Sequence, residues 1–317
     1  MRLAQEPDLA LLRIFITVCE LGSLSAAGKA LGMSQQAVSS RMRALELYVG
    51  EPVFTRSTRG SGLTPTGTII AGWASDVLSA ARRFELGVES VRDTAVRRLD
   101  VAASLTISEY LLPGWLAALR DRQESDGGVV TQVRLRAVNS ENVVAAVRNG
   151  DVMLGFIETP DVPTDVSSAQ IGSDKLCVAV APSHPWARKG KPITASELVG
   201  TPLVMREQGS GTRRALEHAF QLVAATVGDP APPRIECAST ATVRTTIAAG
   251  VAPGVLSELA IADDLALGRL VAVDVVGLAL ARPLNAVWAS RRAALPLPAR
   301  QLIQIAARSP RRLAVTA

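Results

Sequence analysis

Polar side chains that could recognise DNA are concentrated between residues 34 and 43. A glutamine amide offers a hydrogen-bond donor and an acceptor together, which matches the edge of an adenine in the major groove. An arginine donates to phosphate oxygens or to a guanine. This short segment therefore holds the residue types of a base-reading surface, and we expect contacts from Ser34, Gln35, Gln36, Ser39, Ser40, Arg41 and Arg43.

Three short helical patterns would position these side chains. Apolar residues recur at helical spacing over residues 9–21, and a second pattern covers residues 26–31, with Ser25 as its expected cap. Gly32 is expected to supply a tight turn with positive φ before a third helix over residues 35–49. A helix-turn-helix unit of this kind carries its last helix into the major groove.

The third helix is expected to be amphipathic, with Ser34 as its cap and a basic segment after it. After Gly50, residues 52–63 place Arg56 and Arg59 among glycine and serine, the composition of a flexible wing beside the phosphate backbone. A helical hairpin that only builds a core is the alternative interpretation. The apolar stripe that would face the core consists of Val38, Met42, Leu45 and Val49.

Residues 65–92 predict a long helix that pairs with a second copy of the chain. Thr64 can cap it, and Pro65 suits the first helical position, because a missing N–H costs nothing there. Apolar residues then recur in alternating steps of three and four, the seam spacing of a coiled coil. A dimer would place two recognition helices about one DNA turn apart on an inverted repeat, whereas the alternative is a long helix lying on its own domain. The candidate dimer residues are Ile70, Trp73, Val77, Ala80, Phe84 and Val91.

The run GSLSAAGKALGMSQQAVSSRMRALE, the Gly50, Phe54 and Arg56 that follow, and the LTPTG at residues 63–67 resemble the N-terminal domain of LysR-type transcriptional regulators. The resemblance implies an α+β multidomain chain, often a dimer that pairs into a tetramer. Its parts would be a winged helix-turn-helix (1–64), a linker helix (65–92) and a two-lobed α/β effector-binding domain of the periplasmic-binding-protein type (93–317).

The resemblance also assigns residues and shows departures. Gln35, Gln36 and Ser39 stand where the family reads bases. The family often has Arg and then Gln where this chain has Ser40 and Arg41, and a Pro or Ser where it has Gln36. These changes leave the docking mode intact but leave the operator sequence open.

From residue 98 onward, predicted strands and helices alternate, which favours a parallel sheet covered by helices. We expect a first lobe over residues 98–168 and 270–317 and a second lobe over residues 169–269. Two connections between the lobes would form a hinge. Ligands of such sheets bind at the carboxyl ends of the strands.

Three loops at predicted strand ends are candidates for effector contact. The sharpest is REQGSGTR, from Arg206 to Arg213, which resembles a stretch common in LysR-type effector domains. Its glycines allow close approach, and the next helix offers free N–H groups, which suits a carboxylate, sulfate or phosphate. Arg206 could pair with such an anion or with Glu207, and the sequence leaves both open. The candidate effector residues are Ser104, Thr106, Asn139, Ser140, Arg206, Gly209, Ser210 and Thr212.

The net charge of +5 is not evidence for DNA binding, because it depends on the C-terminal end. No acidic residue follows Asp274, and without the seven arginines after it 27 basic residues (34 − 7) would face 29 acidic ones. We expect these arginines to form a solvated face or a frayed end. They are Arg282, Arg291, Arg292, Arg300, Arg308, Arg311 and Arg312.

Several features exclude other classes of protein. No apolar run reaches the roughly 20 residues of a membrane helix and no apolar leader is evident, so we expect a cytoplasmic protein that does not contact membranes. Cys19, Cys177 and Cys237 are isolated, which predicts free thiols, with a redox sensor as the alternative. No cysteine–histidine spacing suggests a metal site, and we expect no cofactor.

The leading hypothesis is a regulator of transcription that binds double-stranded DNA and a small effector, with RNA polymerase as a candidate partner. An enzyme is disfavoured because the sequence has neither a nucleophile elbow nor a phosphate-binding loop, and His184 and His218 are its only histidines. The alternative is a cytoplasmic small-molecule-binding protein of the same fold without gene control, which the N-terminal unit disfavours.

Overall fold

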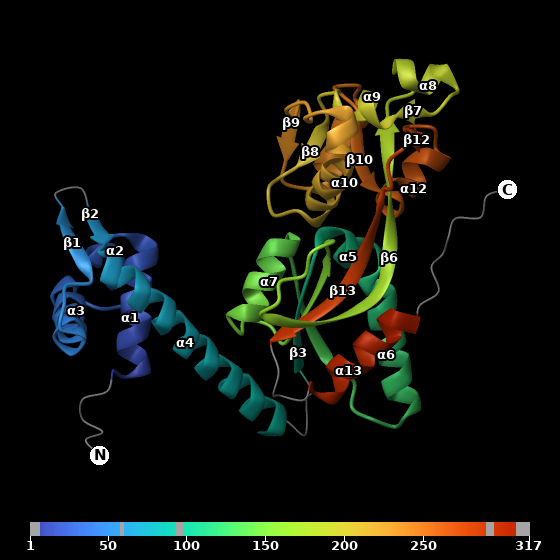
Figure 1. Cartoon of the computed structure of the whole chain (residues 1–317). Coiled ribbons are helices and arrows are strands. Elements are labelled where there is room, and N and C mark those ends of the chain that lie inside the picture. Colours follow the sequence, from blue (N-terminus) through green and yellow to red (C-terminus); the bar gives the residue numbers. More distant parts are fainter. Residues whose placement is uncertain (1–6, 58–59, 93–97, 290–294, 309–317) are drawn as a thin grey trace. The chain divides into compact units, whose positions relative to one another are not determined.

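The computed structural model describes residues 7–57, 60–92, 98–289 and 295–308. The chain forms two compact units, Met1–Val88 and Glu89–Ala317, whose elements are labelled in Figure 1. Arg59 lies outside the described residues, as do the side chains of Arg56 and Val91.

The first unit consists of three helices followed by a hairpin. The helices are α1 (Leu9–Leu21), α2 (Leu24–Leu31) and α3 (Gln35–Val49). Strand β1 (Phe54–Ser57) pairs antiparallel with β2 (Gly60–Leu63). This order is that of a winged helix-turn-helix.

Side-chain caps fix where α2 and α3 begin. The Ser34 hydroxyl accepts from the backbone N–H of Ala37 at 3.2 Å, as expected. The cap of α2 is Ser23 and not Ser25, because the helix begins at Leu24 and its first-turn N–H groups already face the Ser23 hydroxyl. Gly32 ends α2 with φ 66°, which confirms the predicted turn.

One apolar core joins the three helices to the hairpin. Phe15 and Val18 of α1 and Val38 and Leu45 of α3 are at most 1% exposed. Phe54 of β1 packs on Phe15 with the ring centroids 5.6 Å apart. Burial of this set forces the opposite side of α3 outward.

Helix α4 (Pro65–Arg92) starts directly after the hairpin. The Thr64 hydroxyl caps it, accepting from the backbone N–H of Gly67 at 2.9 Å. A Cβ at Gly67 would collide with the carbonyl oxygen of Val53, so the helix can approach the hairpin only with glycine there. Ala74 is 3% exposed within the same core, which fixes the first turns of α4 to the first unit.

The second unit contains one long sheet, in the strand order β4-β3-β5-β13-β6-β10-β8-β9, with β11 paired to β6. The parallel strands of the first lobe are β3 (Arg98–Ala103), β4 (Gln132–Ala137) and β5 (Leu154–Glu158). The parallel strands of the second lobe are β8 (Val204–Arg206), β9 (Ile235–Cys237) and β10 (Gly254–Ser257).

Two antiparallel strands run through both lobes (Figure 1). They are β6 (Val166–Val180) and β13 (Ala281–Ala289). The chain returns to the first lobe along β13 and not at residue 270, because β11 (Val271–Val273) pairs with the second-lobe end of β6. The outward crossing lies further along β6 than residue 169, since Ala169 pairs with Ala286, which also pairs with Phe156 of first-lobe strand β5, and only residues 176–180 pair with β10 and β11.

Helices cover both faces of the sheet in each lobe. In the first lobe, α6 (Leu112–Ser125) and α13 (Leu297–Arg308) cover one face and α7 (Ser140–Arg148) the other. In the second lobe, α10 (Gly211–Val227) covers one face, and α11 (Thr240–Ala248) and α12 (Glu258–Ala266) cover the other. The remaining elements are α5 (Leu105–Tyr110), α8 (Pro185–Lys189), β7 (Ile193–Thr194), α9 (Ala195–Val199) and β12 (Val275–Val276).

Because the parallel strands are buried on both faces, they read as apolar runs in the sequence. Every residue of β5 and of β10 is buried. A polar residue at the carboxyl end of such a strand is therefore placed at the sheet edge where the lobes meet.

Candidate functional site

Helix α3 presents a polar face to solvent. Ser39 is half-buried at the edge of this face, and the buried side of the helix carries Val38 and Leu45. The structure thus keeps the candidate base-reading residues outside the core of the first unit. The exposed candidates are Ser34, Gln35, Gln36, Ser40, Arg41 and Arg43.

The contacts that these side chains make are few and local. The Ser25 hydroxyl donates to Gln35 Oε1 at 2.8 Å, which leaves the amide NH₂ of Gln35 to donate elsewhere. Arg41 lies 3.8 Å from Asp8, with side chains 50% and 61% exposed, and such a surface pair contributes little. Gln36 makes no hydrogen bond to a described residue. The polar face of α3 therefore points to solvent, and few hydrogen bonds within the protein engage its side chains.

The wing is attached to α3 through a backbone contact. The Val53 N–H donates to Glu46 Oε1 at 3.1 Å, so the start of the hairpin is held by a side chain of α3. Across the hairpin, the Thr55 hydroxyl donates to the carbonyl oxygen of Gly62 at 3.1 Å. Arg56 follows Thr55 on β1, opposite Ser61 of β2.

Helix α4 exposes an apolar stripe. Trp73 is 63% exposed, Val77 46% and Phe84 72%, and Ala80 is also exposed. Ile70, the first residue of the expected seam, instead packs half-buried against the core of its own unit. Large apolar side chains that gather in one exposed patch usually mark a surface that another molecule covers.

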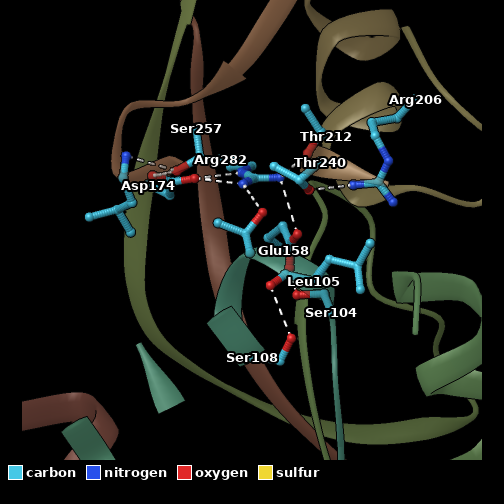
Figure 2. A network of polar contacts seen from close by, with 12 residues as sticks. Ser104, Leu105, Ser108, Glu158, Asp174, Arg206, Thr212, Thr240, Ser257 and Arg282 are labelled. Atoms are coloured by element: carbon cyan, nitrogen blue, oxygen red, sulfur yellow. Dashed lines mark hydrogen bonds and ion pairs between the residues drawn. The ribbon is translucent and has the colours of Figure 1, made fainter. Parts of the chain in front are cut away.

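In the second unit, polar side chains from both lobes meet at the strand ends (Figure 2). Ser104 follows β3, Glu158 ends β5, Arg206 ends β8 and Ser257 ends β10. We call this group the junction cluster, and its members are Ser104, Thr106, Glu158, Asp174, Arg206, Glu207, Thr212, Thr240, Ser257 and Arg282.

Arg282 of β13 lies at the centre of the junction cluster and is 1% exposed. Its Nε and Nη2 donate to Asp174 Oδ2 at 2.8 and 2.6 Å. Its Nη2 also donates to the Thr106 hydroxyl at 3.2 Å, and its Nη1 donates to the Thr212 hydroxyl at 2.9 Å. Glu158 Oε1 lies 3.4 Å from Nη1. One guanidinium thereby bonds a residue of each lobe.

Glu158 is a buried carboxyl group at the carboxyl end of β5. It is 2% exposed and accepts a hydrogen bond from the Ser104 hydroxyl. Burial raises the pKa of Glu158 to about 7; Arg282 opposes this rise, and Asp174 adds to it. Glu158 therefore titrates near neutral pH.

Arg206 binds its own neighbour in the chain. Its Nε and Nη2 donate to the Glu207 carboxylate at 2.8 and 2.9 Å, and its Nη1 donates to the Thr240 hydroxyl at 2.9 Å. Asn139 of the first lobe donates to the same carboxylate at 3.3 Å. Of the two partners that the sequence left open for Arg206, the structure shows Glu207.

The REQGSGTR loop packs directly on the first lobe. The Glu141 N–H donates to the carbonyl oxygen of Gly209 at 3.2 Å, and Gly209 has φ 81°. A Cβ at Gly211 would collide with the carbonyl oxygen of Glu158 and lie 2.6 Å from Ser140 Oγ. The start of α10 therefore faces first-lobe backbone, and only glycine allows this approach.

The structure brings all eight candidate effector residues to the contact between the lobes. Four belong to the junction cluster, and Asn139 bonds to Glu207 within it. Gly209 touches the first lobe. Ser140 is 4% exposed, and its hydroxyl makes no hydrogen bond to a described residue. Ser210 is 2% exposed at the start of α10 and makes no side-chain capping bond.

Sequence reasoning missed Glu158, Asp174 and Arg282. Arg282 was expected on a solvated face, and that expectation is wrong, because the side chain is buried between two carboxylates. The sequence did contain a signal for Glu158. This residue ends the apolar strand β5, just as Ser104 directly follows the apolar strand β3. Arg282 is the one charged residue of β13, and Asp174 stands beside Lys175 in the middle of β6. Charged residues are rarely buried unless they pair, so neither position predicted burial.

The three cysteines are free thiols. Burial raises the pKa of both Cys19 and Cys177 to about 11, so neither is a thiolate near neutral pH, and Cys237 is buried. Within the described ranges, no group of His, Cys, Asp and Glu residues is placed to hold a metal ion. No helix there is both long and apolar enough to cross a membrane.

Comparison with known families decides between the hypotheses. Residues 9–68 match the bacterial regulatory helix-turn-helix protein, lysR family, and residues 92–310 match the LysR substrate binding domain. The chain belongs to the LysR family. It is a LysR-type transcriptional regulator with an effector-binding domain, as the sequence predicted.

Relatives and solved structures agree with this assignment. The chain is 44% identical over 286 residues to an uncharacterised HTH-type transcriptional regulator of Mycobacterium tuberculosis, covering 90% of this chain and 92% of that one. It is 28% identical to the regulator CbbR of Xanthobacter flavus, over 90% and 83% of the two chains. The fold is that of full-length CbnR, solved with its target DNA, at a TM-score of 0.61 and 22% identity, over 95% and 99% of the chains.

Proposed function

We propose that this LysR-type regulator reads an inverted-repeat DNA site with two copies of α3. The observation that carries the proposal is the outward polar face of α3, in which Gln35 and Gln36 are exposed while the opposite side is buried. Side chains near the start of a recognition helix lie deepest in the major groove, and both glutamines occupy the first turn. CbnR, which has the same fold, was solved with its target DNA.

Each polar residue of this face has a role that its chemistry suggests. Gln35, Gln36 and Ser39 read base edges. Arg41 and Arg43 reach phosphates or a guanine, and Arg56 of the wing, with Arg59, contacts the backbone beside the major groove. Ser34 and Ser40 lie at the rim of the same face and donate to phosphate oxygens.

A footprint on the region upstream of the protein's own gene or of a neighbouring gene tests this proposal. We expect protection of two half-sites about one helical turn apart. The Gln35→Ala, Gln36→Ala double variant loses the protection, and the control Glu20→Ala, an exposed residue of α1, keeps it. Absence of protection at every moderate salt concentration contradicts the proposal.

The dimer forms through the apolar stripe of α4. Trp73, Val77 and Phe84 are 46–72% exposed in the single chain, and a coiled-coil seam at this spacing would cover them. Trp73→Glu should dissociate the dimer, and light scattering during gel filtration would show the halved mass. The control Leu222→Glu replaces a similarly exposed apolar residue of α10, which is 73% exposed, and leaves the mass unchanged. A dimer that persists in Trp73→Glu contradicts this role for α4.

An effector acts on the contact between the two lobes. The eight candidate residues lie there, and the two crossing strands β6 and β13 provide the connection about which the lobes can move. An effector that binds one arrangement better than the other shifts the population of the two. This shift in population changes how α4 holds the two helix-turn-helix units of the dimer.

The cellular setting follows from this function. A DNA-binding regulator works in the cytoplasm, where RNA polymerase is its candidate partner. Dimers that pair into a tetramer would read two adjacent sites. We assign no catalytic step to the chain, since the family consists of regulators.

A further inference from the structure

Ser25 is a serine of α2 that does not serve as a helix cap. The sequence suggested it for that role, but the Ser23 hydroxyl accepts from the Ala26 N–H at 3.3 Å, and the Ala27 N–H donates to the Ser23 carbonyl oxygen. Ser25 is the second residue of α2 and is exposed. Its hydroxyl reaches the next helix instead and donates to Gln35 Oε1 at 2.8 Å.

The packing of α2 on the start of α3 brings these two side chains together. Ser25 and Gly28 are three residues apart and therefore lie on the same side of α2. A Cβ at Gly28 would lie 2.8 Å from the carbonyl oxygen of Met33 and 3.5 Å from the backbone nitrogen of Gln35. The Met33 N–H also donates to the carbonyl oxygen of Gly28 at 2.8 Å. The meeting of Ser25 with Gln35 thus follows from the close backbone approach within the helix-turn-helix.

The bond changes what Gln35 can offer to DNA. A glutamine side chain has an NH₂ group that donates and an oxygen that accepts, and adenine is read with both. Because Ser25 draws Oε1 toward α2, the amide presents its NH₂ rather than both groups to a base edge. An acceptor that loses water when the helix docks also needs a donor, since an unpaired one costs free energy, and the Ser25 hydroxyl supplies it.

Gln36 provides an internal comparison. It is the next residue of α3, it is exposed as well, and it makes no hydrogen bond to a described residue. Its amide can turn to use the donor and the acceptor together, as adenine requires. Two neighbouring glutamines of equal chemistry are therefore expected to read different bases.

We propose that Ser25 is a positioning residue that sets the base specificity of Gln35, which it makes a hydrogen-bond donor that selects a keto base, guanine or thymine. This inference rests on the proposed function, because it refines what the same helix face reads. In the major groove guanine presents N7 and O6 as acceptors and thymine presents O4. Cytosine presents only a donor, and adenine presents one acceptor beside a donor.

Titrations of the full chain on variants of the half-site protected in the footprint test the proposal. Each base pair of the half-site is replaced in turn by the other three, and binding is measured by fluorescence anisotropy at one salt concentration. The position that Gln35 reads is the one whose base preference is lost in Gln35→Ala. At this position we expect the unmodified chain to bind guanine or thymine on one strand about fivefold more tightly than adenine or cytosine.

Variants of Ser25 and Gln35 separate positioning from a structural role. Ser25→Ala releases the amide, so adenine should rise to within about twofold of the preferred base, while the preference at the position of Gln36 stays. Ser25→Thr keeps a hydroxyl and should keep the preference for a keto base. Gln35→Glu still accepts from Ser25 but has no donor, and it should lose that preference. Thermal melts followed by circular dichroism show that each variant folds.

Three results overturn the proposal. The first is a preference for adenine at the position of Gln35 in the unmodified chain. The second is a loss of affinity in Ser25→Ala that is equal for all four bases, which would make Ser25 structural only. The third is a keto preference that survives in Gln35→Glu, because it would not depend on the NH₂ group. Absence of any footprint with the unmodified chain would refute the proposed function and this inference with it, whereas the three results refute the inference alone.

Discussion

The two recognition surfaces of this regulator are built in opposite ways. The face of α3 draws its side chains from ten consecutive residues, leaves them exposed and gives them few internal bonds. The junction cluster draws on residues from Ser104 to Arg282, buries most of them and bonds them to one another. The first surface can lose a side chain without harm to the fold, whereas the second holds its domain together.

Removal of Arg282 should expose this difference most strongly. Arg282→Met leaves Glu158 and Asp174 buried without their shared cation, and breaking a buried pair in this way costs about 3–5 kcal/mol. Urea unfolding followed by tryptophan fluorescence would measure the loss. The matched control Arg300→Met, at an exposed position on α13, should change stability by less than about 0.5 kcal/mol. Equal stabilities of the two variants would mean that the junction cluster does not support the domain.

The charge of Glu158 gives the next largest effect. Its folded pKa of about 7 lies above the ordinary 4.5, so between these values the native state binds more protons than the unfolded state. The free energy of unfolding therefore falls as pH rises from about 5 to 8, by about 3 kcal/mol from this group.

Glu158→Gln removes this titration. Urea unfolding at pH 5.5 and pH 8 should show a smaller loss of stability in the variant than in the unmodified chain. The difference between the two chains isolates Glu158 from all other titrating groups. The same pH slope in both would show that folding does not shift the pKa of Glu158.

On the side of α3, the smallest effect comes from the helix cap. Ser34→Ala removes the acceptor of the Ala37 N–H and should cost about 1 kcal/mol. Hydrogen exchange of the amides in the first turn of α3 should then speed up about fivefold, if local opening governs it. Ser40→Ala, on the exposed side of the same helix, should not change it. A faster exchange throughout the first unit would mean that Ser34 supports the whole unit and not only its own helix.

The difference between the surfaces also explains what the sequence could predict. The base-reading candidates depend on local spacing, since a buried stripe through Val38 and Leu45 fixes which side of α3 is exposed. The carboxyl ends of the predicted strands could also be recognised in the sequence. The rule that ligands bind at these ends selected Ser104, Thr106 and Thr212, and all three belong to the junction cluster.

The pairings inside the junction cluster could not be predicted. Asp174 and Arg282 are 108 residues apart, and no spacing rule joins positions on two antiparallel strands before their register is known. The lobe boundary was missed for the same reason, because only the pairing of β11 with β6 assigns β11 to the second lobe. The cap at Ser23 was missed because Ser25 offered equivalent chemistry two residues later.

The most direct test of the account compares Gln36→Ala and Arg43→Ala in DNA titrations over a range of salt concentrations. If α3 enters the major groove, Gln36→Ala weakens the specific site by about 1–3 kcal/mol and leaves the salt dependence unchanged. Arg43→Ala, if it contacts phosphate, weakens all sequences alike and lowers the salt slope by about one. Unchanged affinity in both variants would contradict the claim that the outward face of α3 reads DNA.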